Sequence, residues 1–274
     1  LQALSESLKS FKVGPIAFAI KARPQSVDME LFSQLKSMGM FRVFLGIEAG
    51  TRQSLSQLGR HQTPEDNARA LDIVQRLDIH TCFNLLLLNP DSTLEDVKQN
   101  VAFLRQHCHN PMNFCRTEVY SGTPLEARLR QQGRLLGNFW GWDYRITDPR
   151  AQLAFRILYP AFAARNYGEN GLHHTAMRVD YELQLLTHFH GKHPELPGKV
   201  KRYVQEVNLN TCDFLDEAID AIATSAVTSQ NAKSFTTDLR MRVERHNLAL
   251  VAEGLQLVEE IAAASQPQDR SAPT

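Results

Sequence analysis

The sequence predicts an α/β fold, with parallel strands and crossover helices in its first half and an all-α domain in its second half. Up to about residue 136, apolar runs typical of strands alternate four times with capped segments typical of helices. From residue 148 onward only helical patterns remain. Four consecutive strand-then-helix units build a parallel sheet with right-handed crossovers, either as an open sheet or as an arc of a barrel.

The four predicted strands are runs of β-branched, aromatic and aliphatic residues, as buried parallel strands require. They cover residues 15–23, 41–47, 80–90 and 113–120. The helix after each strand has a recognisable beginning: Ser26 as a cap, Thr63 before a proline, a Ser92/Glu95 capping box, and Thr123 before a second proline.

The second half contains an aromatic connector followed by four helical patterns, which predict a bundle packed on the sheet. The expected helices cover 148–166, 173–190, 195–226 and 232–264. The expected division of the chain is a barrel part at 1–136, the connector at 137–147, a helical domain at 148–264 and a disordered tail at 265–274.

Composition excludes several classes of protein. Thirty Lys plus Arg balance thirty Asp plus Glu in 274 residues, so no net field favours nucleic acid or an anionic membrane. No apolar run approaches the roughly 20 residues that span a bilayer. The four cysteines form no CxxC pair and no disulfide framework, which favours a reduced, cytoplasmic setting.

Polar side chains lie at or near the end of every predicted strand, where parallel α/β proteins bind their ligands. They are Lys21 and Arg23 on the first strand, Glu48 on the second, Asn84 on the third, and Glu118 and Tyr120 on the fourth. Strand ends are also polar simply because loops are polar, and this alternative stays open for each residue. It is weakest for Glu48 and Asn84, since both adjoin apolar runs where an unpaired polar group costs about 1–3 kcal/mol.

Three segments of the first half resemble the latter part of a radical S-adenosylmethionine (SAM) enzyme core. They are VFLGIEAGTRQSLSQLGR, TPEDNARALDIVQRLDIHTCFNLLLLNPDSTLEDVKQNVAFL and VYSGTPLEARLRQQGRL. The resemblance is greatest to enzymes whose core follows a cobalamin-binding domain, and it covers about residues 12–136. It implies that the sheet is part of a TIM-like (β/α) barrel, comprising the third to sixth strands of such a core.

The resemblance also implies roles for matching positions. Glu48 occupies the strand-end position that bonds SAM near its ribose or amino-acid portion. Arg60 matches an arginine that reaches the SAM carboxylate, which a guanidinium binds bidentately. Asn84 matches a position that faces the ligand. Glu118 and Tyr120 match the strand that lines the adenine or substrate side.

Further contacts at the rim are expected from Lys21 and Arg23. In the intact enzyme, a 4Fe–4S cluster would cleave SAM to a 5′-deoxyadenosyl radical that acts on a small organic molecule or a peptide. With cobalamin, methyl transfer is an outcome that the resemblance implies.

The sequence departs from the pattern of such enzymes in its cysteines. The CxxxCxxC loop that binds the cluster is absent, and Cys82, Cys108, Cys115 and Cys212 are scattered. Asn89 also replaces a glycine that usually follows the fifth strand. The chain is therefore expected to be the C-terminal portion of a larger enzyme, inactive alone, with its cluster ligands supplied by a missing N-terminal segment.

An alternative from another class of protein remains. The chain could be a non-catalytic, ligand-binding or accessory subunit that a partner chain completes, because an incomplete barrel leaves strand edges free for pairing. The sequence assigns neither a catalytic residue nor a metal ligand to this chain.

Overall fold

The computed structural model describes residues 2–11 and 14–265, so nearly all of the predicted tail lies outside the described residues. The elements of the first half are α1 (Gln2–Ser10), β1 (Phe18–Ala22), the 3₁₀ helix η1 (Pro24–Ser26), α2 (Met29–Ser37), β2 (Met40–Glu48), α3 (Arg52–Gln57), α4 (Pro64–Arg76), β3 (His80–Leu88), α5 (Leu94–Gln106), β4 (Met112–Arg116) and α6 (Pro124–Gln131). Those of the second half are β5 (Leu135–Asn138), β6 (Gly141–Tyr144), α7 (Pro149–Tyr167), α8 (Leu172–His190), α9 (Leu196–Ala223) and α10 (Ala232–Ala264).

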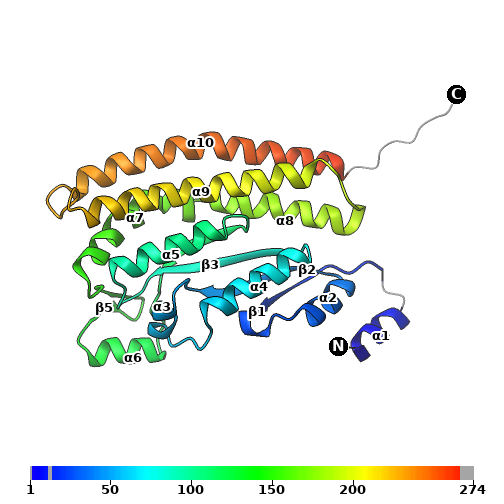
Figure 1. Ribbon diagram of the computed structural model, residues 1–274, viewed down its shortest axis with the longest axis horizontal. Coiled ribbons are helices and arrows are strands. Elements are labelled where there is room, and N and C mark those ends of the chain that lie inside the picture. The colour runs from blue at the N-terminus through cyan, green and yellow to red at the C-terminus, as the bar shows by residue number, and fades with distance from the viewer. Residues whose placement is uncertain (1, 12–13, 266–274) are drawn as a thin grey trace.

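Strands β1 to β4 form one parallel sheet in their order along the chain, with a helix after each strand (Figure 1). The predicted α/β fold, a partial (β/α) barrel followed by a helical region, is therefore confirmed. The predicted fourth strand is too long, since β4 ends at Arg116. Glu118 and Tyr120 consequently lie in the segment between β4 and α6.

The sheet has one covered face and one open face. On β2, Val43, Leu45 and Ile47 are fully buried, whereas the alternate residues, among them Phe44, are only partly buried. On β3, Asn84 is exposed between two buried neighbours. This period of two places the apolar residues against the crossover helices and leaves the opposite face accessible for a ligand.

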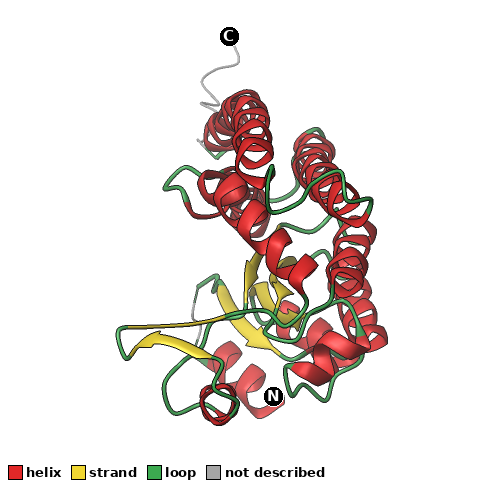
Figure 2. Cartoon of the chain, turned by 90° about the vertical axis from the view of Figure 1, so that its left-hand side faces the viewer, coloured by secondary structure: helices red, strands yellow, loops and turns green. Residues whose placement is uncertain are grey.

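Helices α7 to α10 lie along one side of the sheet (Figures 1 and 2). Helix α5 packs between the sheet and α9, while α8 contacts β2, β3 and β4. One continuous apolar core joins the strands to α7 and α9, including Phe114 on β4 and Phe162 on α7, whose rings meet edge to face. No helix in the described part of the chain combines the length and apolar character that a membrane crossing requires.

Two predicted helix caps are wrong by one or two residues. Helix α2 is capped by Asp28, which accepts a hydrogen bond from the amide of Leu31, and not by Ser26. Helix α5 has its capping box at Thr93 and Asp96, whereas Ser92 accepts a hydrogen bond from the amide of Asn89.

The aromatic connector is more ordered than a linker. Together with Leu135 and Leu136 it forms the antiparallel hairpin of β5 and β6, which projects from the body of the molecule (Figure 2). Its tip residues Phe139 and Trp140 are exposed, Trp140 to 92%, and do not pack between the two halves of the chain. Tyr144, at the end of β6, is buried and anchors the hairpin.

Candidate functional site

A cavity of about 1020 Å³ lies at the carboxyl ends of β2, β3 and β4. Its walls come from these strand ends, from the segment after α3, and from the N-terminus of α6. The lining includes five of the seven residues that the sequence indicated: Glu48, Arg60, Asn84, Glu118 and Tyr120. The structure thus brings together side chains that are up to 72 residues apart in sequence, from Glu48 to Tyr120.

The other two indicated residues, Lys21 and Arg23, do not line this cavity. Strand β1 is short, and its last residue Ala22 pairs with Leu45, three residues before the end of β2. The end of β1 therefore lies below the rim that Glu48 helps to form. Lys21 extends instead over the ring of Phe44, 5.9 Å from its centroid.

Glu48 ends β2 in an uncommon backbone conformation. Its φ is +64°, in the left-handed region that side chains disfavour. The amide of Ala49 donates to the carbonyl of Ile47 at 2.7 Å, which closes a γ-turn around Glu48. This turn directs the Glu48 carboxylate to Arg60, whose guanidinium lies 3.0 Å from Oε1. Strain of this kind persists where the surrounding structure holds it, and it is concentrated at ligand sites.

Two buried amides hold that turn in place. Gln62 Nε2 donates to the carbonyls of Gly46 and Ile47, both at 2.8 Å. Asn67 Nδ2 donates to the carbonyls of Ile47 at 3.0 Å and Ala49 at 2.9 Å. The end of β2 is thereby fixed by one side chain from just before α4 and one from its first turn.

The small residues after Glu48 are required by close packing. Ala49 is fully buried. A Cβ atom on Gly50 would come within 2.4 Å of the Cβ of Phe103 on α5, and the Gly50 amide donates to Asn100 Oδ1 at 2.8 Å. Only glycine permits this approach, which packs the turn directly against α5.

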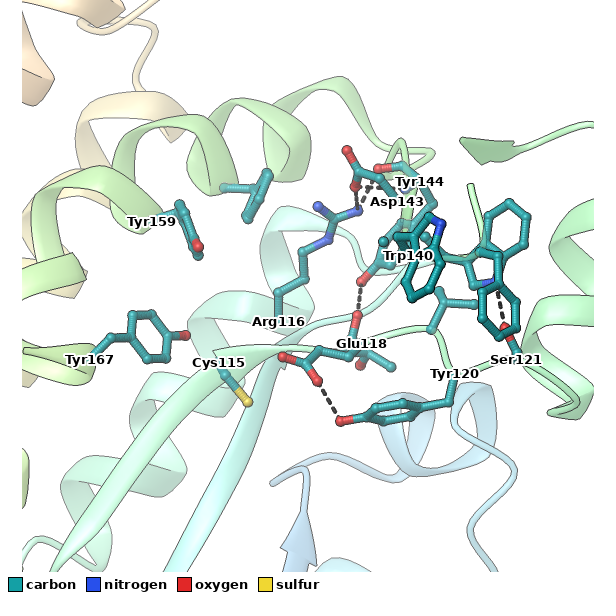
Figure 3. A pocket seen from close by; sticks show the side chains of 16 residues that line it. Cys115, Arg116, Glu118, Tyr120, Ser121, Trp140, Asp143, Tyr144, Tyr159 and Tyr167 are labelled. Carbon is teal, nitrogen blue, oxygen red and sulfur yellow. Dashed lines mark hydrogen bonds and ion pairs between the residues drawn. The ribbon is translucent and has the colours of Figure 1, made fainter. Parts of the chain in front are cut away.

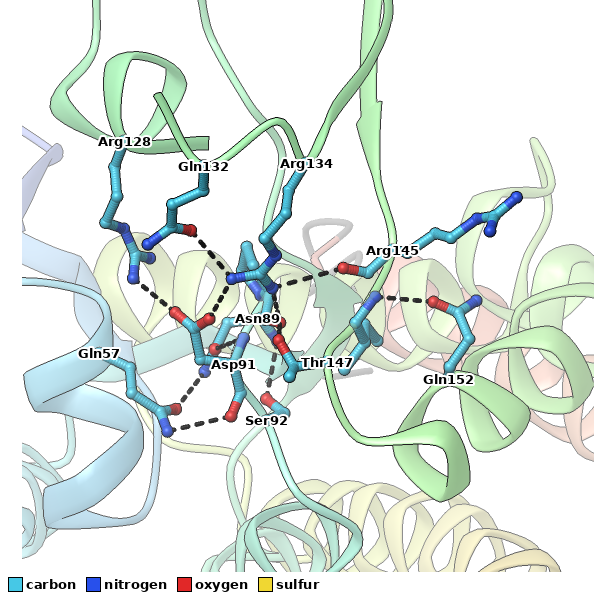
Figure 4. A network of polar contacts seen from close by, with 12 residues as sticks. Gln57, Asn89, Asp91, Ser92, Arg128, Gln132, Arg134, Arg145, Thr147 and Gln152 are labelled. Atoms are coloured by element: carbon cyan, nitrogen blue, oxygen red, sulfur yellow. Dashed lines mark hydrogen bonds and ion pairs between the residues drawn. The ribbon is translucent and has the colours of Figure 1, made fainter. Parts of the chain in front are cut away.

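The loop after β3 is organised around Asp91 (Figure 4). Its carboxylate pairs with Arg128 at 2.6 Å and with Arg134 at 2.7 Å, and its amide donates to Asn89 Oδ1. Although burial acts in the opposite direction, hydrogen bonds from the two arginines lower the pKa of Asp91. Asn89, which replaces the expected glycine, also donates to Gln57 Oε1 at 2.9 Å and so links this loop to α3.

The segment after β4 separates the first cavity from a second one of about 880 Å³ (Figure 3). Residues 115–118 and Tyr120 line both cavities. The Tyr120 hydroxyl donates to the Glu118 carboxylate, which raises the pKa of Tyr120. Burial, reinforced by the carboxylates of Glu118 and Glu48, raises the pKa of Cys115 to about 11, so this thiol is neutral at physiological pH.

Several lining residues were not indicated by the sequence. Asn113 and Cys115 alternate along β4, so the period of two could have identified them. Tyr167 comes from the end of α7 and lines both cavities. It enters the site through the packing of the helical region on the sheet, for which the sequence has no local signal.

The residues of the first cavity fit SAM by chemistry and size. SAM carries a carboxylate, an ammonium group and ribose hydroxyls, and the cavity lining provides three guanidinium groups, two carboxylates and three side-chain amides. The volume is that of a site for a ligand of this size. Within the described ranges, no group of three or more His, Cys, Asp or Glu side chains is placed to hold a metal ion.

The fold is a parallel α/β half-barrel with a cavity at the carboxyl rim of its strands. Among solved structures, the chain is similar to the cobalamin-dependent SAM radical enzyme OxsB in its apo form, with a TM-score of 0.60 and 13% identity. That match covers 96% of this chain and 48% of the other. OxsB with aqua-cobalamin and SAM bound gives a TM-score of 0.56 at 14% identity, over 95% and 44% of the two chains.

In sequence, the chain is 24% identical over 153 residues to a Pyrococcus horikoshii protein described as an uncharacterized methyltransferase. The match covers 56% of this chain and 33% of that protein. A scan against protein-family models finds no match. The resemblance to radical SAM enzymes of the cobalamin type is thus confirmed at the level of the fold, and the chain spans less than half the length of these relatives.

Proposed function

We propose that the chain is the SAM-binding portion of a radical SAM enzyme that modifies an organic substrate, with cobalamin-dependent methyl transfer as the reaction. The observation that carries this proposal is the convergence of Glu48, Arg60 and Asn84 on one cavity at the rim of the sheet. The residues that would ligate a 4Fe–4S cluster belong to another part of the enzyme.

The two ends of the Glu48–Arg60 ion pair match the two charges of the amino-acid part of SAM. Arg60 binds the carboxylate through its guanidinium, and Glu48 binds the ammonium group or a ribose hydroxyl. The exposed amide of Asn84, which has no side-chain hydrogen bond within the described part of the chain, faces the same space. The cofactors supply the chemistry, and these residues bind and orient SAM.

The comparisons support the proposal in two ways. The OxsB structures, one of them with SAM bound, share the fold of this chain. The Pyrococcus horikoshii relative is described as a methyltransferase. Because the chain covers only part of each, the activity of the whole enzyme is inferred from these relatives together with the cavity.

Equilibrium dialysis with radiolabelled SAM tests the proposal on the 274-residue chain. We expect saturable binding that Glu48→Ala and Arg60→Ala each weaken by at least about tenfold, a loss of ~1.4 kcal/mol. The Arg52–Glu65 pair is a matched control, because it also has a 3.0 Å contact but lies outside the cavity. Arg52→Ala and Glu65→Ala should bind SAM like the parent chain. Absence of saturable binding, or equal loss in both pairs of variants, would overturn the assignment.

A second function is favoured by the free edge of β1. Among the described residues this strand pairs on one side only, with β2, and Ala19 and Lys21 on it are exposed. An accessory subunit that a partner completes would pair at this edge. Size-exclusion chromatography tests this second function. Pairing through β1 predicts dimers or larger species, and an Ala19→Pro substitution should reduce their fraction. A monomer at high concentration would count against this function.

A further inference from the structure

The second cavity is lined largely by aromatic side chains. Five of them are partly or largely exposed and come from three separate parts of the chain: the segment after β4, the hairpin and α7 (Figure 3). They are Tyr120, Phe139, Trp140, Tyr159 and Tyr167. Exposed aromatic residues gathered from distant segments form a surface for stacking, because each ring offers a large apolar face at little conformational cost.

Among the described residues that line this cavity, the single arginine is already paired with a carboxylate. Arg116 pairs with Asp143 at 2.8 Å, and its guanidinium lies 3.6 Å from the ring centroid of Tyr144 and 4.3 Å from that of Phe155. A hydrogen bond to the Tyr144 carbonyl also fixes its orientation. Arg116 therefore orders the hairpin against α7 and is not available to bind an anionic ligand.

The remaining charge of the lining is the carboxylate of Glu118. It is exposed, and within the described residues it forms no ion pair; its contact is the hydrogen bond from Tyr120. Its field reaches the neighbouring side chains, since the Glu118 carboxylate contributes to the raised pKa values of Cys115 and Tyr167. The cavity thus combines aromatic faces with an unneutralised negative charge.

We propose that this second cavity binds an aromatic organic cation, meaning a ligand in which a planar ring carries or adjoins a positively charged nitrogen. The ring stacks on the exposed aromatic side chains, and the cation lies against Glu118 and the faces of neighbouring rings. Cation–π contacts and a carboxylate together select such a ligand over neutral or anionic aromatic compounds.

This ligand is the substrate of the enzyme, a role that rests on the proposed function. The two cavities share the wall formed by residues 115–118 and Tyr120, so ligands in them would be neighbours. Binding itself does not depend on SAM, which makes the two proposals separable by experiment.

Tryptophan fluorescence reports directly on this cavity, because both tryptophans of the chain, Trp140 and Trp142, line it. Titration with benzyltrimethylammonium should shift tryptophan emission to shorter wavelength as Trp140, which is 92% exposed, becomes covered. Two probes divide the ligand into its parts: tetramethylammonium has the charge without the ring, and phenylacetate has a ring with the opposite charge. We expect both to bind at least about tenfold more weakly.

Substitutions in the cavity measure separately what the carboxylate charge and what aromatic stacking contribute to the affinity for benzyltrimethylammonium. Glu118→Gln keeps the shape and should weaken benzyltrimethylammonium binding by about tenfold, equivalent to ~1.4 kcal/mol. Tyr159→Ala, on an exposed face of α7, should weaken it by roughly threefold without affecting the fold. Glu65→Gln, an exposed carboxylate outside the cavity, should have no effect.

Equal affinity for benzyltrimethylammonium and phenylacetate, or an unchanged affinity in Glu118→Gln, would overturn the inference. Binding of the aromatic cation without SAM binding in dialysis would leave the cavity assignment intact and refute the proposed function. SAM binding without selective binding of the cation would refute this inference alone.

Discussion

The carboxylate of Glu48 and the guanidinium of Arg60 lie 3.0 Å apart at the end of β2, each partly exposed to the cavity. These two groups neutralise one another. The amino-acid part of SAM carries a carboxylate and an ammonium group, so it can replace this single ion pair by two. The cost of separating Glu48 from Arg60 is small, since partly exposed ion pairs contribute about 0–1 kcal/mol.

Exchanging the two charges tests whether their positions matter for binding. The double variant Glu48→Arg with Arg60→Glu retains an ion pair, so its free energy of unfolding in urea should stay within about 1 kcal/mol of the parent value. Its affinity for SAM in dialysis should nevertheless fall by at least about tenfold, because the ligand charges now meet like charges. Unchanged affinity would mean that the pair is only structural.

The left-handed backbone at Glu48 predicts an unusual order of stability. Because φ is +64° there, Glu48→Gly should be more stable to urea than Glu48→Ala by about 1 kcal/mol. Asp72, exposed in the interior of helix α4, provides the control, since Asp72→Gly should be less stable than Asp72→Ala there by up to about 1 kcal/mol. The same order at both positions would contradict the γ-turn.

Much of the fold could be predicted because its signals are local. The beginning of α4 at Thr63 and Pro64 follows from capping chemistry, and the helices of the second half follow from their apolar spacing. The predicted capping box of α5 lies one residue too early, because the sequences STLE and TLED both fit the capping-box pattern. Only the structure shows that Ser92 caps the turn at Asn89 and leaves Thr93 to begin the helix.

The sequence predicts those site residues whose position follows from the direction of the strands. It does not predict those whose position depends on the register between strands or on helix packing. Glu48 ends β2 and Asn84 lies on the neighbouring strand β3, so the topology alone brings them to one cavity. Lys21 fails to join them because β1 ends level with Leu45. Tyr167 was missed because it reaches the cavity through packing of α7, 47 residues after Tyr120.

The buried amide of Asn67 should position Glu48 without contacting its side chain, through the carbonyls of Ile47 and Ala49 on either side of it. Asn67→Ala leaves the carbonyl of Ala49 buried without its donor and should lower the free energy of unfolding by about 2–3 kcal/mol. SAM affinity should also fall, since the γ-turn loses one of its supports. Asn170→Ala, at an exposed position before α8, should change stability by less than about 0.5 kcal/mol. A destabilised Asn67→Ala that binds SAM like the parent would contradict the positioning role.

The sheet and the helical region are joined by a buried histidine and a half-buried aspartate. His80 begins β3, and its Nδ1 contacts a carboxylate oxygen of Asp180 on α8. Burial alone would lower the pKa of His80, but the Asp180 carboxylate outweighs it and raises the pKa to about 9. Burial opposes ionisation of the neighbouring Cys82 thiol, but its contacts with His80 and Arg42 outweigh burial and lower the pKa of Cys82.

Because the pKa of His80 is raised in the folded chain, the free energy of unfolding should fall as the pH rises. Below about pH 6.5, His80 is protonated in both the folded and unfolded chain, and its contribution to stability is fully present. Between there and about pH 9, unfolding releases its proton, so the free energy of unfolding should fall by up to about 1.4 kcal/mol per pH unit from this group. Urea unfolding from about pH 6.5 to about pH 9 measures this slope, to which the lowered pKa of the Cys82 thiol contributes with the opposite sign. Asp180→Asn should flatten it, whereas Asp72→Asn, at an exposed pair on α4, should leave it unchanged. A slope that survives Asp180→Asn would show that the pH dependence arises elsewhere.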